Sequence, residues 1–222
     1  MTWNSNWEEI FKNSQRGKYP PEELIRFIAR RYYHEPDRKS LKILEVGCGS
    51  GANIWYLARE GFAVYGIDGS KTAIHQANLR LDTENLNAEL TVGDIINLPY
   101  KKDFFDCIID VECIYANTLA DSKNIIEEIY RVLKPGGNFF SKTFMEGIVK
   151  PGDGTLLKGE PHTYQSISTG PLSAKVGIQR LTSENDIARL YSVFTIESVD
   201  YIIRSEENRK YEIREFLISC KK

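Results

Sequence analysis

The segment from Leu41 to Gly51, with the sequence LKILEVGCGSG, constrains the fold of this chain more than any other. Ile43, Leu44 and Val46 form the short apolar run expected of a strand that is buried on both faces. Three glycines follow, and glycine lets the backbone approach a ligand that a Cβ atom would hold away. A buried strand that runs into a glycine-rich turn before a helix is where α/β proteins hold a nucleotide-like cofactor.

The order of the predicted elements indicates a parallel sheet. Apolar runs alternate with amphipathic stretches, which predicts strands joined by right-handed crossovers. The predicted strands cover residues 41–46, 63–67, 88–93, 104–111 and 137–144, and the predicted helices between them cover residues 52–60, 71–81 and 122–133. Two amphipathic helices precede this region, and a helix at 183–191 follows it. Two long terminal strands, at 194–204 and 211–220, flank a polar turn and predict an antiparallel pair.

Composition argues against several classes of function. A net charge of −2 and the lack of a block of Lys or Arg disfavour a nucleic-acid partner. No segment approaches the roughly 20 apolar residues that span a bilayer, and the first residues lack a secretory signal, so we expect a cytoplasmic protein with no membrane partner. The four Cys form no C-x-x-C pair and the three His lie far apart, which predicts no metal site.

The glycine pattern alone leaves more than one class of protein open. Gly47, Gly49 and Ala52 also satisfy the dinucleotide fingerprint G-x-G-x-x-G/A, so an NAD-linked Rossmann oxidoreductase is one alternative. A noncatalytic module that binds a cofactor or a partner is another. The rest of the chain has to discriminate between them.

Four further features accompany the loop: Glu45 before the first glycine, Asp68 at the end of the second predicted strand, Gly93-Asp94-Ile95 at the end of the third, and Leu133-Lys134-Pro135-Gly136-Gly137 before another strand. This combination resembles the class I S-adenosylmethionine-dependent methyltransferases of the small-molecule type, firmly over about 41–144 and loosely beyond. The resemblance implies a Rossmann-like, doubly wound α/β fold with a mostly parallel seven-stranded sheet, an antiparallel last strand and N-terminal helices. It implies S-adenosylmethionine as cofactor and a hydroxyl, amine or similar group of a small molecule as methyl acceptor.

The resemblance also implies roles around the cofactor. The glycine loop would approach its methionine portion, Asp68 would accept its ribose hydroxyls, and Asp94 with the amide of Ile95 would bind its adenine. From the residues alone, Asp68 would equally satisfy the start of a helix, and Asp94 a solvated turn. The expected cofactor-binding residues are Glu45, Gly47, Cys48, Gly49, Gly51, Asp68, Gly69, Gly93, Asp94, Ile95, Asp110, through its main chain, and Tyr19.

The acceptor side is expected where the fourth strand ends. Glu112 and Tyr115 follow that strand at the crevice of an open α/β sheet, and for each a structural role is the competing interpretation. The glycine-rich stretch after Phe144 is long for a connection in an α/β domain and contains His162, our third catalytic candidate. We expect it to form a lid together with Trp7, Tyr19 and the N-terminal helices, the alternative being a surface loop or an oligomer contact.

The predicted organisation is a single methyltransferase domain over residues 1–222. Residues 1–40 would form an N-terminal helical cap and residues 41–144 the cofactor-binding core. Residues 145–180 would form the substrate lid or insertion, and residues 181–222 the C-terminal helix and strand pair.

Overall fold

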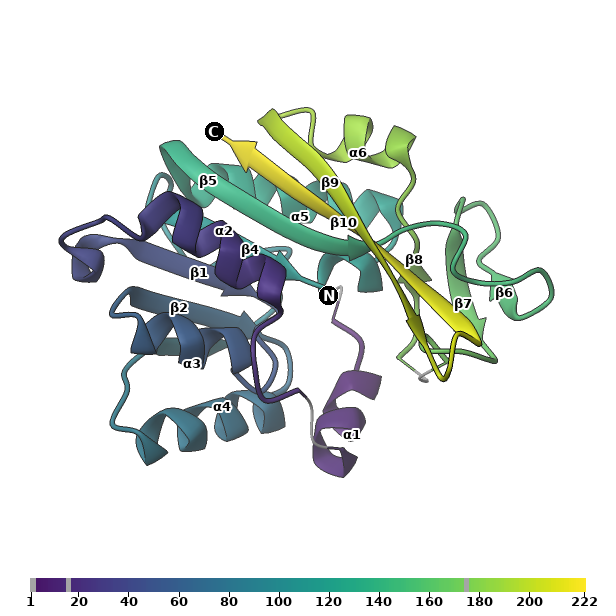
Figure 1. Cartoon of the computed structure of the whole chain (residues 1–222), viewed down its shortest axis with the longest axis horizontal. Coiled ribbons are helices and arrows are strands. Elements are labelled where there is room, and N and C mark those ends of the chain that lie inside the picture. Colours follow the sequence, from purple (N-terminus) through teal and green to yellow (C-terminus); the bar gives the residue numbers. More distant parts are fainter. Residues whose placement is uncertain (1–2, 15–16, 174–175) are drawn as a thin grey trace.

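The computed structural model describes residues 3–14, 17–173 and 176–222. Its main sheet has seven strands in the order β3-β2-β1-β4-β5-β10-β9 (Figure 1). They are β1 (Lys42–Val46), β2 (Ala63–Asp68), β3 (Glu89–Val92), β4 (Phe105–Val111), β5 (Leu133–Phe144), β9 (Thr195–Glu206) and β10 (Tyr211–Lys221). Neighbours among β1 to β5 pair in parallel, and β10 runs antiparallel to β5 and β9. The doubly wound fold with an antiparallel last strand is therefore confirmed.

Helices cover both faces of this sheet because its central strands bury side chains on both. Along β1, Ile43 belongs to one apolar core and Leu44 to the other, as the alternation of a strand requires. The first core holds α2 (Glu22–Tyr32), α3 (Ala52–Arg59) and α4 (Lys71–Thr83), and the second holds α5 (Leu119–Val132) and α6 (Glu184–Leu190). Over the residues that the structure describes, no helix is both long and apolar enough to cross a bilayer.

Local sequence fixes where several of these helices begin. The hydroxyl of Ser70 accepts a hydrogen bond from the N–H of Ala73 at the start of α4, and Thr118 does the same for Asp121 at the start of α5. Ser183 and Asp186 form a reciprocal capping box at the start of α6. These caps satisfy amide groups that a helix leaves free at its first turn.

The segment between β5 and α6 is more ordered than expected. The sequence predicted an irregular stretch, but the structure has a small antiparallel sheet of β6 (Gly154–Leu156), β7 (Thr163–Ile167) and β8 (Gln179–Arg180). Its strands are short and lie among turn residues, which hid their alternation. They bury Ile167 against Phe144 and Ile213 of the main sheet. Figure 1 shows this small sheet beside one end of the β9–β10 pair.

Two short helical turns and helix α1 complete the described structure. The 3-10 turns η1 (Arg38–Ser40) and η2 (Ile114–Ala116) precede β1 and follow β4. Helix α1 (Asn6–Asn13) lies away from the other N-terminal helix and beside α4 (Figure 1). β5 begins at Leu133, earlier than predicted, with a register shift opposite Phe105 and Cys107 that accommodates the glycine pair before Asn138.

Two glycines with similar backbone angles allow a test of how α3 and α4 pack. Gly51, with a φ of +81°, leaves no room for a Cβ atom, which would lie 2.8 Å from the Cβ of Ala77, whereas Gly61, with a φ of +87°, has nothing within 4 Å. We expect Gly61→Ala to lower the free energy of unfolding by about 1 kcal/mol. Gly51→Ala should cost about 1–3 kcal/mol more because of the clash. Urea unfolding measures both, and equal losses would contradict a packing role for Gly51.

Candidate functional site

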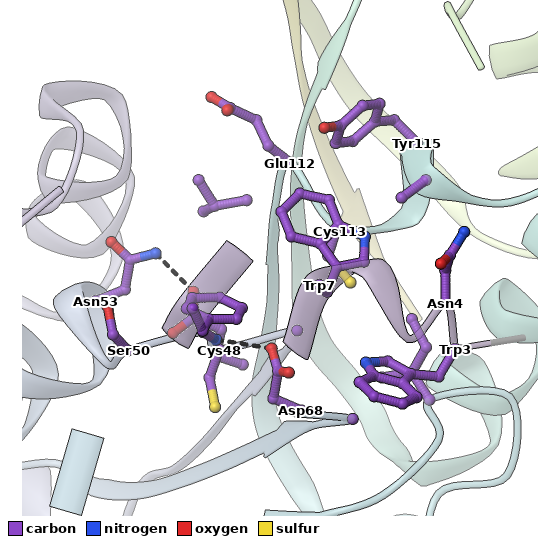
Figure 2. A pocket seen from close by; sticks show the side chains of 18 of the residues that line it. Trp3, Asn4, Trp7, Cys48, Ser50, Asn53, Asp68, Glu112, Cys113 and Tyr115 are labelled. Carbon is purple, nitrogen blue, oxygen red and sulfur yellow. Dashed lines mark hydrogen bonds between the residues drawn. The ribbon is translucent and has the colours of Figure 1, made fainter. Parts of the chain in front are cut away.

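A cavity of about 270 Å³ opens at the carboxyl ends of the central strands. It lies where β1 and β4 are neighbours and the order of the strands in the sheet reverses. Figure 2 shows side chains from two parts of the chain on this space, among them Trp3 and Trp7 with Asp68 and Glu112. The core contributes Glu45, Gly47, Cys48, Gly49, Ser50, Ala52, Asn53, Asp68, Gly69, Gly93, Asp94, Ile95, Val111, Glu112, Cys113, Tyr115, Ala116 and Asn117. The N-terminal part contributes Trp3, Asn4, Trp7, Phe11 and Gly17.

The glycine loop is tied to the end of β2. The N–H groups of Gly47 and Cys48 both donate to the carbonyl of Ile67, at 2.8 and 3.1 Å. A Cβ atom on Gly47 would lie 2.1 Å from the Sγ of Cys113, so glycine is required for the loop to approach the end of β4. Gly51, expected among the cofactor-binding residues, lies outside the cavity lining and serves the contact between α3 and α4.

Asp68 links the loop to the start of α4. Its Oδ2 accepts from the N–H of Gly49 at 2.9 Å and its Oδ1 accepts from the N–H of Ser70 at 2.8 Å. Burial raises the pKa of this carboxyl. Asp68 thus binds an amide at the start of α4, which is the alternative role that we considered for it from the sequence. It also lines the cavity, next to Gly69.

Glu45 has a buried carboxyl group, and one of its two oxygens has no hydrogen-bond partner in the structure. Its Oε1 accepts from the side-chain amide of Asn53 at 2.6 Å, while its Oε2 is buried without a hydrogen-bond partner. Burial raises the pKa of Glu45 to about 8. An unpaired buried carboxyl oxygen is costly, and a cationic group in the cavity would satisfy it.

A second buried carboxylate shapes the turn after β4. Asp110 accepts from the N–H groups of Cys113 and Ile114, at 3.0 and 3.1 Å, and from the hydroxyl of Ser141 at 2.7 Å. Burial raises its pKa to about 6. The residue is not part of the cavity lining, so its side chain positions the turn that carries the next residues.

Glu112 occupies that turn in a left-handed conformation, with a φ of +57°, which is uncommon for a residue with a side chain. Its Oε1 accepts from the ammonium of Lys142 on β5 at 2.6 Å. Lys142 also donates to Glu215 of β10, and Glu215 accepts from Arg204 of β9. Charges of alternating sign therefore run from the edge of the sheet to the cavity, and we call these four residues the charge array.

The array sets the protonation of its two carboxyls in opposite directions. Burial raises the pKa of Glu112, with Glu215 adding to the shift and Lys142 opposing it. Glu215 is fully buried, which alone would raise its pKa, but its hydrogen bond with Glu112 and the charges of Lys142 and Arg204 hold that pKa below the ordinary value. The carboxyl that faces the cavity is thus the one better suited to take up a proton.

Tyr115 forms a wall of the cavity that the insertion supports from behind. Its ring packs edge-on against Phe144, with centroids 4.9 Å apart, in the apolar cluster that contains Ile167 and Leu172. The described residues between 145 and 180 support this wall but do not themselves line the cavity.

Two predicted residues lie elsewhere. His162 is 44% exposed in its side chain and its Nδ1 lies 3.2 Å from Glu146. Tyr19 is 66% exposed and packs edge-on against Trp55, on the outer side of α3. Neither lines the cavity, because the insertion folds as its own small sheet and because Tyr19 follows the segment that turns toward α2. We do not assign them to the site.

The N-terminal segment supplies Trp3 and Phe11, which the sequence did not assign to the site, and Trp7, which we expected in the lid. The indole of Trp3 lies where a Cβ atom of Gly69 would stand, with a closest distance of 1.9 Å, and the ring of Phe11 lies against Gly49. Glu8 fastens α1 to α4 by accepting from the hydroxyls of Ser70 and Thr72, at 2.6 and 2.5 Å. The only sequence signal was the helical spacing of apolar residues, which does not say where a helix docks.

Comparisons with known proteins agree with this geometry. Residues 43–137 match a family model described as a methyltransferase domain. Norajmaline N-methyltransferase of Rauvolfia serpentina is 28% identical over 149 residues, covering 66% of this chain and 50% of that protein. The 2-heptyl-1-hydroxyquinolin-4(1H)-one methyltransferase of Mycobacteroides abscessus is 26% identical, covering 73% and 76%. As with the norajmaline enzyme, the chain spans about half the length of several other curated relatives that it matches.

Solved structures share the fold. A S-adenosylmethionine-dependent methyltransferase of Methanosarcina mazei superposes with a TM-score of 0.66 at 24% identity, over 82% of this chain and 92% of its own. Residues 43–137 therefore match a methyltransferase domain and share the fold of an enzyme that uses S-adenosylmethionine. The site suits that cofactor, since the unpartnered Oε2 of Glu45 can accept from its ammonium and the glycine loop lines the cavity.

The charge array predicts unequal costs for removing two lysines. Lys142→Met leaves Glu215 and Glu112 without their shared cation, and breaking a buried ion pair costs about 3–5 kcal/mol of unfolding free energy. Lys134→Met removes an ion pair with Asp106 that is partly exposed, which should cost less than about 1 kcal/mol. Chemical denaturation compares the two variants. Similar losses would show that the array contributes no more than a surface pair.

Proposed function

We propose that this protein transfers a methyl group from S-adenosylmethionine to a hydroxyl, amine or similar group of a small molecule. The observation that carries the proposal is the composition of the cavity. The glycine loop with Asp68 and Asp94 suits a polar cofactor, and Glu112, Tyr115 and Trp7 suit an acceptor that combines an apolar body with a polar group. Both sets line one space, which a transfer between two bound molecules requires.

Helix α1 supports a chamber closed to water. Trp7 and Phe11 line the cavity from α1, which Glu8 attaches to α4, and Trp3 lines it from the residues just before that helix. Alignment of the reactants and exclusion of water are the main tasks of a methyl-transfer enzyme, because the acceptor has to meet the methyl group in line. We expected a lid made of residues 145–180 together with Trp7, Tyr19 and the N-terminal helices. In this proposal α1 with Trp7 forms the lid, and the insertion holds Tyr115 in place.

Glu112 is the proton acceptor in this proposal. When bound, S-adenosylmethionine supplies an electrophilic methyl group on a sulfonium. A hydroxyl or a protonated amine has to lose its proton to react with it, whereas a neutral amine does not. Glu112 is a carboxyl on the acceptor side of the cavity, Lys142 fixes its position, and its pKa is raised by burial. Tyr115 contributes an aromatic wall that supports a ring-bearing acceptor.

The names of two relatives agree with such an acceptor. One names norajmaline and an N-methyl transfer, and the other names a quinolinone. An NAD-linked oxidoreductase and a noncatalytic binding module remain the alternatives that an experiment has to exclude. The match to a methyltransferase family model favours neither of them.

A binding and turnover assay tests the proposal. Calorimetry should show binding of S-adenosylmethionine and S-adenosylhomocysteine and no comparable binding of NAD. Transfer of a labelled methyl group should occur to some member of a panel of ring compounds with hydroxyl or amino groups. Glu112→Gln should lower that turnover about 100-fold or more and leave the affinity for S-adenosylhomocysteine unchanged. Glu127→Gln, on the exposed side of α5, is the control and should change neither quantity.

The outcomes separate the alternatives. Comparable NAD binding would favour the oxidoreductase. Cofactor binding without turnover on any acceptor would favour the noncatalytic module. Full turnover of the Glu112→Gln variant would remove that residue from the mechanism and leave the methyltransferase proposal standing.

Glu45 predicts proton release on cofactor binding. With a pKa of about 8, its carboxyl is mostly protonated at pH 7, and pairing with the cofactor's ammonium favours the ionised form. Binding of S-adenosylhomocysteine should therefore release about one proton at pH 7, and its affinity should rise as the pH increases from about 6 to about 8 and then level off. Calorimetry in two buffers of different ionisation enthalpy measures the released proton.

Two variants make this measurement specific. Glu45→Gln should release no proton and should bind with an affinity that does not change over the same pH range. Asp94→Asn alters the carboxylate expected beside the adenine, so it should bind more weakly but release the same proton. Undiminished release from the Glu45→Gln protein would assign the proton to another group.

A further inference from the structure

Strand β9 leaves the sheet with a long free edge. It forms the outer side of the main sheet and pairs in the described structure with β10 (Figure 1). Most of its side chains are exposed on both faces. They include Val199, Tyr201 and Ile203, which are 37%, 63% and 49% exposed. A long edge strand offers unpaired backbone groups to another strand, and proteins usually block such edges with proline, charged side chains, short length or a covering element. β9 contains no proline and extends over twelve residues.

The sequence of β9 is complementary to itself in one antiparallel register. Two copies related by a two-fold axis can pair with one residue opposite its own symmetry mate. With Ile202 on the axis, Arg204 stands opposite Asp200 of the second copy, and Tyr201 stands opposite Ile203, each twice. Opposite charges and aromatic side chains beside β-branched ones are stabilising cross-strand pairs.

Neighbouring registers lack this complementarity. With Asp200 on the axis, the two Asp200 carboxylates face each other. With Ile203 on the axis, Asp200 faces Glu206 of the second copy. With Tyr201 on the axis, Arg204 faces Ser198, so no direct pair of opposite charges forms. Like charges directly opposite each other are destabilising, which singles out the register centred on Ile202.

The charge array holds Arg204 ready for such a contact. Its guanidinium donates to the buried Glu215 and lies 3.5 Å from Glu206, and its side chain is still 47% exposed. Asp200 and Arg204 lie on one face of the strand, and Tyr201 and Ile203 lie on the other. The two kinds of cross-strand pair therefore form on opposite faces of the joined sheet without competing for space.

We propose that β9 pairs with β9 of a second copy of this chain, antiparallel and with Ile202 on the two-fold axis. The two main sheets then form one continuous sheet. The proposal does not depend on the activity, because it rests on a part of the molecule that does not line the cavity.

Sedimentation velocity over a range of protein concentrations tests the association. The unaltered protein should form a dimer. Asp200→Lys places a lysine opposite Arg204 at both ends of the contact, and it should raise the dissociation constant about tenfold or more. Asp82→Lys makes the same change of charge at the exposed end of α4 and should leave the constant unchanged. A monomer throughout, or equal effects of the two substitutions, would overturn the proposal.

A disulfide cross-link tests the register directly. Ile202→Cys puts two thiols opposite each other across the axis, where directly opposite residues of antiparallel strands come close enough to bridge. Mild oxidation should give a covalent dimer of this variant. Val193→Cys, also exposed but outside β9, is the control and should remain uncrosslinked. Equal cross-linking of both variants, or none of the Ile202→Cys protein, would overturn the proposed register.

Discussion

The site depends on the attachment of the glycine loop to the end of β2. Two successive N–H groups, of Gly47 and Cys48, share the carbonyl of Ile67, and the next glycine binds the carboxylate of Asp68. These bonds hold the loop against the end of β2, where Asp68 and Gly69 line the cavity. They require a chain without a Cβ atom at Gly47, because Cys113 at the end of β4 fills that space. Three strands thereby meet at one loop.

The sequence predicted what local chemistry determines. A buried strand before glycines, an acid after each of two further strands, and alternating helices were sufficient for the sheet and for about half of the cavity lining. It did not predict where α1 docks, because the bond from Glu8 to Thr72 joins residues far apart in the chain. It also did not predict Lys142, which looks like an ordinary strand residue until β4 and β10 are placed on either side of it. His162 was selected for its imidazole and for its place in the expected lid, and it lies outside the cavity because residues 154–180 fold as a small sheet of their own.

The charge array shows how a carboxyl can stand at an apolar wall. Glu112 faces a space lined by aromatic rings, and an isolated carboxylate there would pay a large desolvation cost. Lys142 offsets that cost, and Glu215 and Arg204 in turn compensate the lysine. Removing any one member leaves a neighbour with an unbalanced charge, so the four residues stabilise the fold only as a set. The same set connects the cavity to the edge strand of the sheet.

The bonds from Glu8 to Ser70 and Thr72 have a kinetic consequence. They attach α1 to the helix that begins directly after Asp68, and Trp3 on the same segment lies against Gly69. With the ribose beside Asp68, as we propose, a demethylated cofactor would lie next to this indole, and its release would displace Trp3 and the attached helix. Release of the demethylated cofactor is then a conformational event. Where that event is slower than the transfer itself, the steady-state rate reports the motion of an N-terminal helix and is insensitive to how reactive the acceptor is.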